Sequence, residues 1–383
     1  MKKNALILST GFAMFSMFFG SGNLVFPLLV GQKSGGHYIL SGMGIFLTGV
    51  LVPFLGVLAM MLCKGSLSEF FRSIGRIGTF VFSLIALTLM GPLGVLPRCV
   101  AVAQGAFHQV MPSIPLIWLS FGLCVAIYFL TANRNKIIPL LGTYLTPILL
   151  CSIVAIAVFA LVKSPLPLIT ESGLAWPSFK EGFFQGYQTM DLLAAFFFST
   201  FVISHLKRST SEEVCEKTSL LTFLKASSIG GGLLTIVYFF LVLLGSIYAS
   251  ELASVPPQEI FGFVAYKTLG SLAAPGMCIA VVLACLTTGV VLTALFADFL
   301  RKDILREKIG NKTSLGITLF IAFLVSTLKF SGIMVFLGPL VATIYPALIV
   351  LTIVNIVHRL WGVKNSHWPT TLTLAAKICL IAI

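Results

Sequence analysis

The feature that most limits the fold of this chain is a succession of apolar segments, each about as long as a bilayer is thick. A transmembrane helix needs about 20 mostly apolar residues. Hydrophobic residues make up 58% of the 383 in the chain and charged residues 10%, which excludes a soluble globular protein. The sequence predicts an all-α polytopic membrane protein. The expected spans are 5–30, 38–62, 77–108, 114–131, 138–162, 178–205, 222–249, 271–300, 314–329 and 332–357.

The loops between these segments are too short to hold a separate soluble domain. We therefore expect a single membrane domain over residues 1–383, with a shorter additional C-terminal helix at 369–383 that contains Lys377. The eight cysteines form no C-x-x-C pair. We interpret them as small apolar residues, and we expect no cofactor and no metal beyond a transported cation.

The net charge of +13 follows from an uneven distribution of basic residues along the chain. Eighteen of the 25 fall on alternate loops that share a face with the N-terminus. This is the positive-inside pattern, which predicts a cytoplasmic N-terminus and a multi-pass protein surrounded by lipid. The charge therefore requires no nucleic-acid partner, and nothing in the sequence implies an obligate protein partner. The basic residues on that face are Lys2, Lys3, Lys64, Arg72, Arg76, Arg134, Lys136, Lys207, Arg208, Lys217, Lys225, Arg301, Lys302, Arg306, Lys308, Lys312, Arg359 and Lys364.

Ten spans divide into two sets of five, and an odd number per set makes the second set enter the membrane from the opposite side. This parity is typical of inverted-topology transporters. We expect one repeat at about 5–162 and the other at about 178–357. In such transporters the first helix of each repeat is interrupted where the substrate binds.

The first helix of the first repeat carries such an interruption in the stretch FFGSGNLVFP, residues 18–27. Pro27 cannot donate to the carbonyl of residue 23, and each interior glycine costs about 1 kcal/mol relative to alanine. These residues favour unwinding near 20–23, which bares carbonyl and N–H groups that lipid cannot satisfy. A cation and a carboxylate would satisfy them. A simple proline kink at a glycine-mediated helix contact is the alternative.

The second repeat carries a matching interruption in QGYQTMD, residues 185–191. We expect this helix to begin at Ser178 with a capping box to Glu181, which places the polar cluster two to four turns into the span.

Three stretches in order, FFGSGNLVFP, GPLGVLPR (91–98) and GYQTMDLLAAFFF (186–198), resemble the signatures of the branched-chain amino acid:cation symporter family of bacteria, the BrnQ-like carrier proteins. IVYFFLVLLGS (236–246) resembles the seventh helix of that family, and the resemblance covers nearly the whole chain. It implies a five-plus-five inverted-repeat, LeuT-like fold with discontinuous first and sixth helices. It also implies import of leucine, isoleucine and valine across the bacterial cytoplasmic (inner) membrane, driven by Na⁺ or H⁺.

The substrate is expected at the two interruptions. We assign backbone contacts with its carboxylate to Gly20, Ser21 and Gly22. From the second interruption, Tyr187, Gln188 and Thr189 complete the expected substrate site.

Oxygen ligands for a cation are expected in the eighth span. Ala284, Thr287 and Thr288 share one helical face at i, i+3 and i+4, and hydroxyl and carbonyl oxygens suit a hard cation. Asn23 adds a side-chain oxygen, or alternatively caps the half-helix. By similarity to related sodium symporters, the carbonyls of Ser16 and Phe19 complete the site. Alternatively, the threonines bond the carbonyl one turn before them.

Three charged residues within spans complete the predicted site. Asp191 pairs with a cation, holds the broken backbone or binds the substrate ammonium. Arg98 bonds carbonyls freed near Pro92 and Pro97, or contacts the substrate. Asp298 lies three turns past Thr287 on the same face, where it lines the inner cation exit or is an interfacial residue near Arg301.

Other functions make different demands on the sequence. A membrane enzyme would need a nucleophile–base pair or a metal-binding cluster at one depth, which the sequence does not display, so we expect no enzyme. A channel would not need a carboxylate-sized interruption in two helices. A transporter for another small neutral amino acid is the closest alternative.

Overall fold

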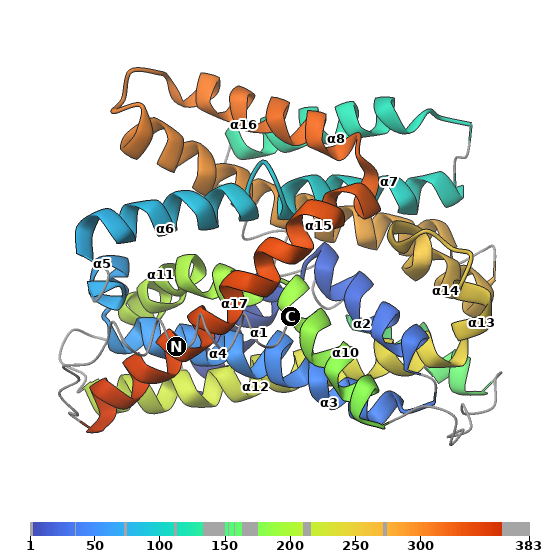
Figure 1. Ribbon diagram of the computed structural model, residues 1–383, viewed down its shortest axis with the longest axis horizontal. Coiled ribbons are helices and arrows are strands. Elements are labelled where there is room, and N and C mark those ends of the chain that lie inside the picture. The colour runs from blue at the N-terminus through green and yellow to red at the C-terminus, as the bar shows by residue number, and fades with distance from the viewer. Residues whose placement is uncertain are drawn as a thin grey trace.

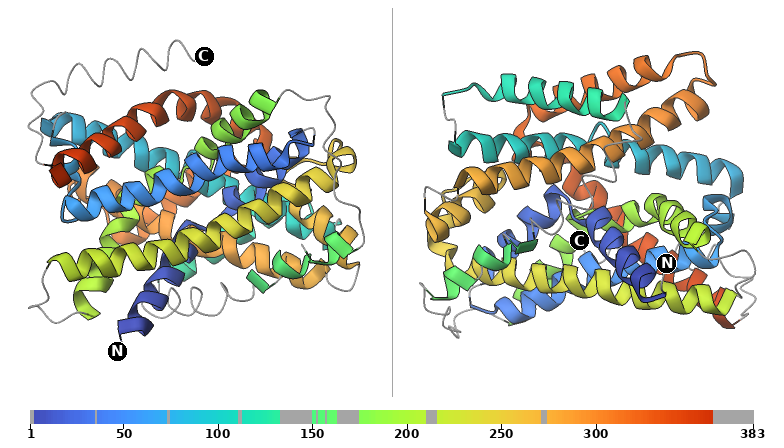
Figure 2. Two further views of the ribbon diagram at one scale, coloured as in Figure 1. Left: turned by 90° about the horizontal axis from the view of Figure 1, so that it is seen from below. Right: turned by 180° about the vertical axis from the view of Figure 1, so that it is seen from behind.

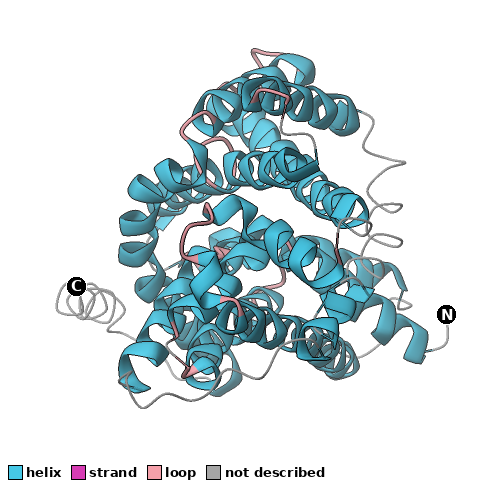
Figure 3. Cartoon of the chain, turned by 90° about the vertical axis from the view of Figure 1, so that its right-hand side faces the viewer, coloured by secondary structure: helices cyan, strands magenta, loops and turns pink. Residues whose placement is uncertain are grey.

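The computed structural model describes residues 3–34, 36–72, 75–110, 113–132, 150–151, 153–156, 158–162, 175–209, 216–270 and 274–361. Helix accounts for all regular structure in these ranges (Figure 3), which confirms the all-α prediction. Five of the described helices are long and apolar enough to cross a membrane, and a bent pair makes a sixth. The expected span 138–162 is described only from residue 150, and the expected helix 369–383 lies outside the described residues.

The helices of the first half follow the apolar segments, with two additional breaks. Residues 91–94 form a turn inside the expected span 77–108, because Pro92 and the flanking Gly91 and Gly94 disfavour helix. A π-helical turn precedes Pro53, which lacks the N–H of a regular helix. The elements are α1 (Lys3–Phe18), α2 (Ser21–Lys33), α3 (Tyr38–Phe46), η1 (Leu47–Leu51), α4 (Val52–Leu62), α5 (Leu67–Phe70), α6 (Gly75–Met90), α7 (Val95–Val110) and α8 (Leu116–Ala132).

The second half repeats the pattern of a broken helix followed by long ones. Its last two helices are divided at residues 327–328, slightly before the expected gap between 329 and 332. The elements are α10 (Ala175–Gln188), α11 (Asp191–Ser209), α12 (Glu216–Ile247), α13 (Ala249–Leu252), η3 (Pro257–Glu259), α14 (Ile260–Leu269), α15 (Ala274–Phe299), η4 (Leu300–Ile304), α16 (Asn311–Ser326) and α17 (Lys329–Trp361).

The helices associate in two groups. In the first, α12 packs along α1 and α2, α10 against α3, and α11 against α4 (Figure 2). In the second, α15 packs against α7, and α8 and α16 cover this pair along one edge of the molecule (Figure 1). The broken helices belong to the first group, and α15 with its threonines belongs to the second. The predicted site therefore lies where the groups meet.

Glycine allows a close helix contact between α3 and α10 in the first group. A Cβ atom on Gly182 of α10 would lie 2.0 Å from the Ser41 carbonyl oxygen, and one on Gly44 of α3 would lie 2.3 Å from the Phe179 carbonyl oxygen. Small residues at such crossings let membrane helices approach backbone to backbone. This contact holds the first half of the second broken helix against α3.

Candidate functional site

The first interruption consists of Phe19 and Gly20. The Phe19 N–H donates to the Phe15 carbonyl at 2.9 Å and completes α1, while Gly20 is extended at φ −129° and ψ −164°. The segments on either side of it are bent by 72°. The expected unwinding over 20–23 is correct only for residue 20. The next three residues form the first turn of α2, and Pro27 lies inside that helix, so the extended Gly20 makes the break.

The start of α2 is buried and faces the break. Ser21, Gly22 and Asn23 are all buried, and the first N–H groups of a helix have no acceptors within it. The Asn23 Oδ1 atom accepts from the Gly20 N–H at 3.0 Å, which is the capping role considered as the alternative. The Ser21 hydroxyl lies 3.2 Å from the thiol of Cys99 on α7. The turn thus places the positive end of α2 inside the protein, an arrangement that suits a carboxylate.

The second interruption consists of Thr189 and Met190. Met190 has φ +63°, a left-handed conformation that is rare for residues other than glycine. The Thr189 hydroxyl donates to the Gly186 carbonyl at 2.9 Å. Of the expected stretch 185–191, the residues up to Gln188 still belong to α10 and Asp191 begins α11, so the break is two residues long.

The expected start of this helix is wrong. The helix already begins at Ala175, so Ser178 is not its cap and makes no capping box with Glu181. Instead the Ser178 hydroxyl donates to the Ser34 carbonyl at 3.1 Å, and Glu181 pairs with Lys33 at 2.9 Å. Both side chains therefore tie α10 to the end of α2.

Hydrogen bonds join the two breaks. The Asn23 Nδ2 atom donates to Oδ2 of Asp191 at 2.7 Å and to the hydroxyl of Tyr238 on α12 at 2.6 Å. The Tyr238 hydroxyl donates to the same carboxylate oxygen at 3.3 Å. If Gly22 had a Cβ atom, this atom would lie 3.4 Å from the Thr189 Cα atom. The backbones of the two breaks are therefore in close contact. All three side chains of the triad are at most 4% exposed.

Arg98 contacts the end of α10. Its Nη1 atom donates to the Gln188 carbonyl at 2.7 Å, and its guanidinium carbon lies 5.4 Å from the centre of the Phe26 ring. The prediction that it bonds carbonyls near Pro92 and Pro97 names the wrong partner. The Gln188 carbonyl at the C-terminus of α10 has no donor within the helix because the helix is interrupted there, and Arg98 reaches it from α7.

Tyr187 and Gln188 turn toward α17. The rings of Tyr187 and Tyr345 are 5.1 Å apart, and Gln188 Nε2 donates to the Gly338 carbonyl at 3.4 Å. The Tyr345 hydroxyl accepts the Leu192 N–H at 3.1 Å, at the start of α11. The second break is therefore anchored to α17 on both of its sides.

The eighth-span threonines approach the first break. The Thr288 Oγ1 atom lies 3.2 Å from the position of a Cβ on Gly20, the residue after Phe19. The hydroxyls of Thr287 and Thr288 both donate to the Ala284 carbonyl, at 2.7 and 3.2 Å. The structure thus contains the self-bonded arrangement considered as the alternative. Ser16 is half-buried in the last turn of α1.

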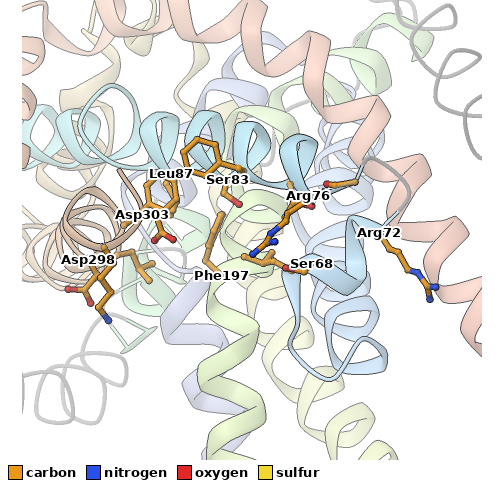
Figure 4. Close-up of a pocket in the computed structure, with 15 residues that line it drawn as sticks. Ser68, Arg72, Arg76, Ser83, Leu87, Phe197, Asp298 and Asp303 are labelled. Carbon is orange, nitrogen blue, oxygen red and sulfur yellow. Dashed lines mark hydrogen bonds between the residues drawn. The ribbon is translucent and has the colours of Figure 1, made fainter. Parts of the chain in front are cut away.

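A cleft of about 750 Å³ separates α5 and α6 from α15 and η4, and Asp298 lies on its wall. Arg76 of α6 and Asp303 of η4 reach into it from opposite walls (Figure 4). Phe197 of α11 follows Asp191 by six residues, and Leu295 of α15 follows Thr288 by seven. The cleft therefore begins about two helical turns from the second break and from the threonine that approaches the first break. The other lining residues are Leu67, Ser68, Arg72, Gly75, Thr79, Phe80, Ser83, Leu87, Phe299 and Lys302.

The residues missed from the sequence are Tyr238, Tyr345 and Cys99. Tyr238 lies in the stretch IVYFFLVLLGS, but no spacing connects that stretch to the two interruptions. The signal that was available is chemical: a tyrosine within an apolar helix needs a partner for its hydroxyl.

Comparison with known proteins places this arrangement in a family. The model of the branched-chain amino acid transport protein family matches residues 2–383. The branched-chain amino acid permease BrnQ of Corynebacterium glutamicum is 31% identical over 94% of the chain and 82% of its own length. The branched-chain amino acid transport system 3 carrier protein of Pseudomonas aeruginosa is 29% identical over 93% of the chain and 81% of its own length.

Solved structures match the fold. MhsT in complex with L-phenylalanine superimposes with a TM-score of 0.62 at 16% identity, over 97% of this chain and 96% of that one. The inward-facing conformation of Mhp1 gives a TM-score of 0.58 at 12% identity, over 98% and 85%. The LeuT-like fold with discontinuous first and sixth helices is therefore confirmed.

Proposed function

Because the chain belongs to the branched-chain amino acid transport protein family, we propose that it imports leucine, isoleucine and valine by symport with Na⁺ or H⁺. It is a multi-pass membrane protein and a transporter, not an enzyme. The coupling ion, the direction of transport, the bacterial inner membrane and the cytoplasmic N-terminus belong to the proposal. The distribution of basic residues supports that orientation.

One observation is the main support for the proposal: a hydrogen bond from Asn23 to Asp191 joins the two broken helices. The N–H groups at the buried start of α2, the positive end of that helix, offer a site for a carboxylate. Asp191 and the carbonyl end of α10 offer negative charge to an ammonium group. A zwitterionic amino acid matches both, and the surrounding phenylalanine-rich helices supply apolar contacts for a branched side chain. A methylene in such contacts is worth about 1–3 kcal/mol, so we expect broad recognition.

The coupling cation binds, in this proposal, between α1 and α15. Its ligands are the carbonyls of Ser16, Phe19 and Ala284 and the hydroxyls of Thr287 and Thr288. The approach of Thr288 to Gly20 supports this placement. The hydroxyls exchange their bonds with the Ala284 carbonyl for bonds to the ion. Asn23 supports the site from the other side of the break, and Asp298 lines the cleft through which ion and substrate leave.

Uptake of radiolabelled leucine into proteoliposomes tests this function. We expect accumulation above equilibrium when an inward Na⁺ or H⁺ gradient is imposed, loss of it when an ionophore collapses the gradient, and competition by isoleucine and valine. Leucine that equilibrates without accumulating under either gradient would contradict symport and favour a channel. Accumulation of another small neutral amino acid but not of leucine would retain the mechanism and change the substrate.

A further inference from the structure

Arg98 is a buried guanidinium whose contacts leave one of its edges unused. It has 0% solvent exposure, and its Nη1 atom reaches the Gln188 carbonyl and, at 3.7 Å, the sulfur of Met334. Among the described residues, neither Nε nor Nη2 has a hydrogen-bond partner. Burying a charge is unfavourable unless hydrogen bonds and an opposite charge compensate it. The part of the chain that the structure describes therefore leaves this charge only partly compensated.

The unused edge has the geometry of a carboxylate site. Nε–H and one N–H of Nη2 point the same way and form the fork that binds both oxygens of a carboxylate. The bond from Nη1 to Gln188 holds the guanidinium in place. The Asp191 carboxylate attracts the Arg98 charge electrostatically. It accepts its hydrogen bonds from Asn23 and Tyr238. No hydrogen bond from the fork to Asp191, or to any other described residue, is present.

The guanidinium lies beside the start of α2. The Phe26 ring, 5.4 Å from the guanidinium carbon, is also 3.4 Å from the position of a Cβ on Gly22. The next residue after Arg98, Cys99, contacts the Ser21 hydroxyl at 3.2 Å. A fixed positive charge therefore lies close to the positive end of a helix.

We infer that Arg98 is the charged ligand of the substrate carboxylate and thereby selects amino acids over neutral analogues that lack this group. The inference rests on the proposed function, because it identifies the bound carboxylate as that of the transported amino acid. Arg98 then contacts the end of α10 and the substrate at once, so that binding neutralises its charge.

Leucinamide provides the test, since it keeps the ammonium group and side chain of leucine and replaces the carboxylate by a neutral amide. Binding of both ligands to purified protein is measured by calorimetry. The wild-type protein should prefer leucine about 100-fold, and Arg98→Gln should reduce this preference below about 5-fold, as expected for the loss of a buried charged pair. Its affinity for leucinamide should stay within about threefold of the wild-type value.

The Arg98→Lys variant distinguishes the effect of the positive charge from the effect of the paired N–H donors. Lysine keeps a positive charge but not the paired donors, so the preference should fall to about 10-fold. This variant also serves if Arg98→Gln does not fold, and an unchanged preference in Arg98→Lys would then overturn the inference. The matched control is Arg359→Gln, which breaks a partly exposed pair with Glu69 and should leave the preference unchanged.

The alternative hypothesis, that Arg98 has only a structural role, predicts a different result. If it serves only to bond the Gln188 carbonyl, Arg98→Gln weakens leucine and leucinamide equally, or neither, and the inference is overturned while leucine binding by the wild-type protein stands. If the wild-type protein binds no leucine, the proposed function fails, and the inference fails with it.

Discussion

Asp191 is the buried carboxylate through which the two broken helices meet. The amide of Asn23 and the hydroxyl of Tyr238 both donate to its Oδ2 atom. An amide at position 191 retains one oxygen that can accept these bonds, so replacing Asp191 by asparagine removes the charge and keeps the shape. In the proposed site, the charge serves the substrate ammonium.

We predict that Asp191→Asn lowers kcat/KM for leucine uptake by about 100-fold, the size expected when a buried charge loses its partner. Uptake in proteoliposomes measures this. Glu251→Gln is the control, because it makes the same replacement in an exposed pair, 2.7 Å from Lys267, and such pairs contribute little. Uptake by Asp191→Asn within twofold of the wild-type rate would remove Asp191 from the substrate site.

The threonines of α15 lead to a second prediction. Thr287→Val and Thr288→Val keep the size of the side chain and remove a proposed cation ligand. Each should raise the cation concentration for half-maximal uptake about 10-fold, as expected for one lost hydrogen-bonding oxygen, with a smaller change in the leucine KM. Thr343→Val on α17 is the control, since its hydroxyl is exposed and bonds the Pro339 carbonyl. A cation dependence equal to that of the control would argue against the site.

The individual site residues differ in how well the sequence predicts them. Asn23 and Asp191 are polar residues beside recognisable interruptions, and the structure brings them together. Tyr238 completes the same cluster but lies in an unremarkable apolar helix, 47 residues from Asp191. Arg98 is recognisable as a buried charge, yet its partner is a carbonyl at position 188, on another helix. Contacts between distant helices depend on packing, which local patterns do not contain.

At the scale of the helices, the sequence predicts that the first and sixth are broken, but the observed breaks are shorter than the predicted stretches 20–23 and 185–191. Glycine and proline lower helix stability over a stretch, so they indicate a region. Within it, the side chains of Asn23 and Thr189 bond the backbone at each break and decide where the helix ends. Pro27 therefore stays inside α2, although its missing N–H suggested unwinding earlier in the chain.

The glycine contact between α3 and α10 gives a prediction at this scale. Gly182→Ala would place a Cβ 2.0 Å from the Ser41 carbonyl oxygen, so one helix must move away from the other. We expect a loss of about 1–3 kcal/mol, as for overpacking, seen as a lower melting temperature in detergent. Gly316→Ala on α16 meets nothing within 4 Å and should be neutral or stabilising. Equal melting temperatures for the two variants would contradict this close approach.

At the scale of the whole molecule, the site lies where two helix groups meet. The broken helices and α12 form one group, and α7, α8, α15 and α16 form the other. Residues of both groups line the cleft, since Phe197 comes from α11 and Leu295 from α15. A cation bound between α1 and α15 would link the groups directly. The ion would bind more tightly to the conformation in which its ligands on α1 and α15 are close together, and it would therefore stabilise that conformation. Ion binding would in this way be coupled to the width of the cleft.

We therefore predict that the coupling cation protects the cleft from solvent. Ser83 of α6 lines the cleft, and Ser83→Cys should react with a membrane-impermeant maleimide in membranes whose cleft side is accessible. Saturating cation should slow this labelling about 5-fold, and leucine should slow it further, as expected when ligands shift the population toward a closed state. Lys308→Cys, at an exposed position of the loop after η4, is the control for reactivity. The background is a variant with Cys151, an exposed cysteine, replaced by serine. Labelling of Ser83→Cys that ignores the cation, or that accelerates with it, would show that ion binding does not close this cleft and would assign the exit path elsewhere.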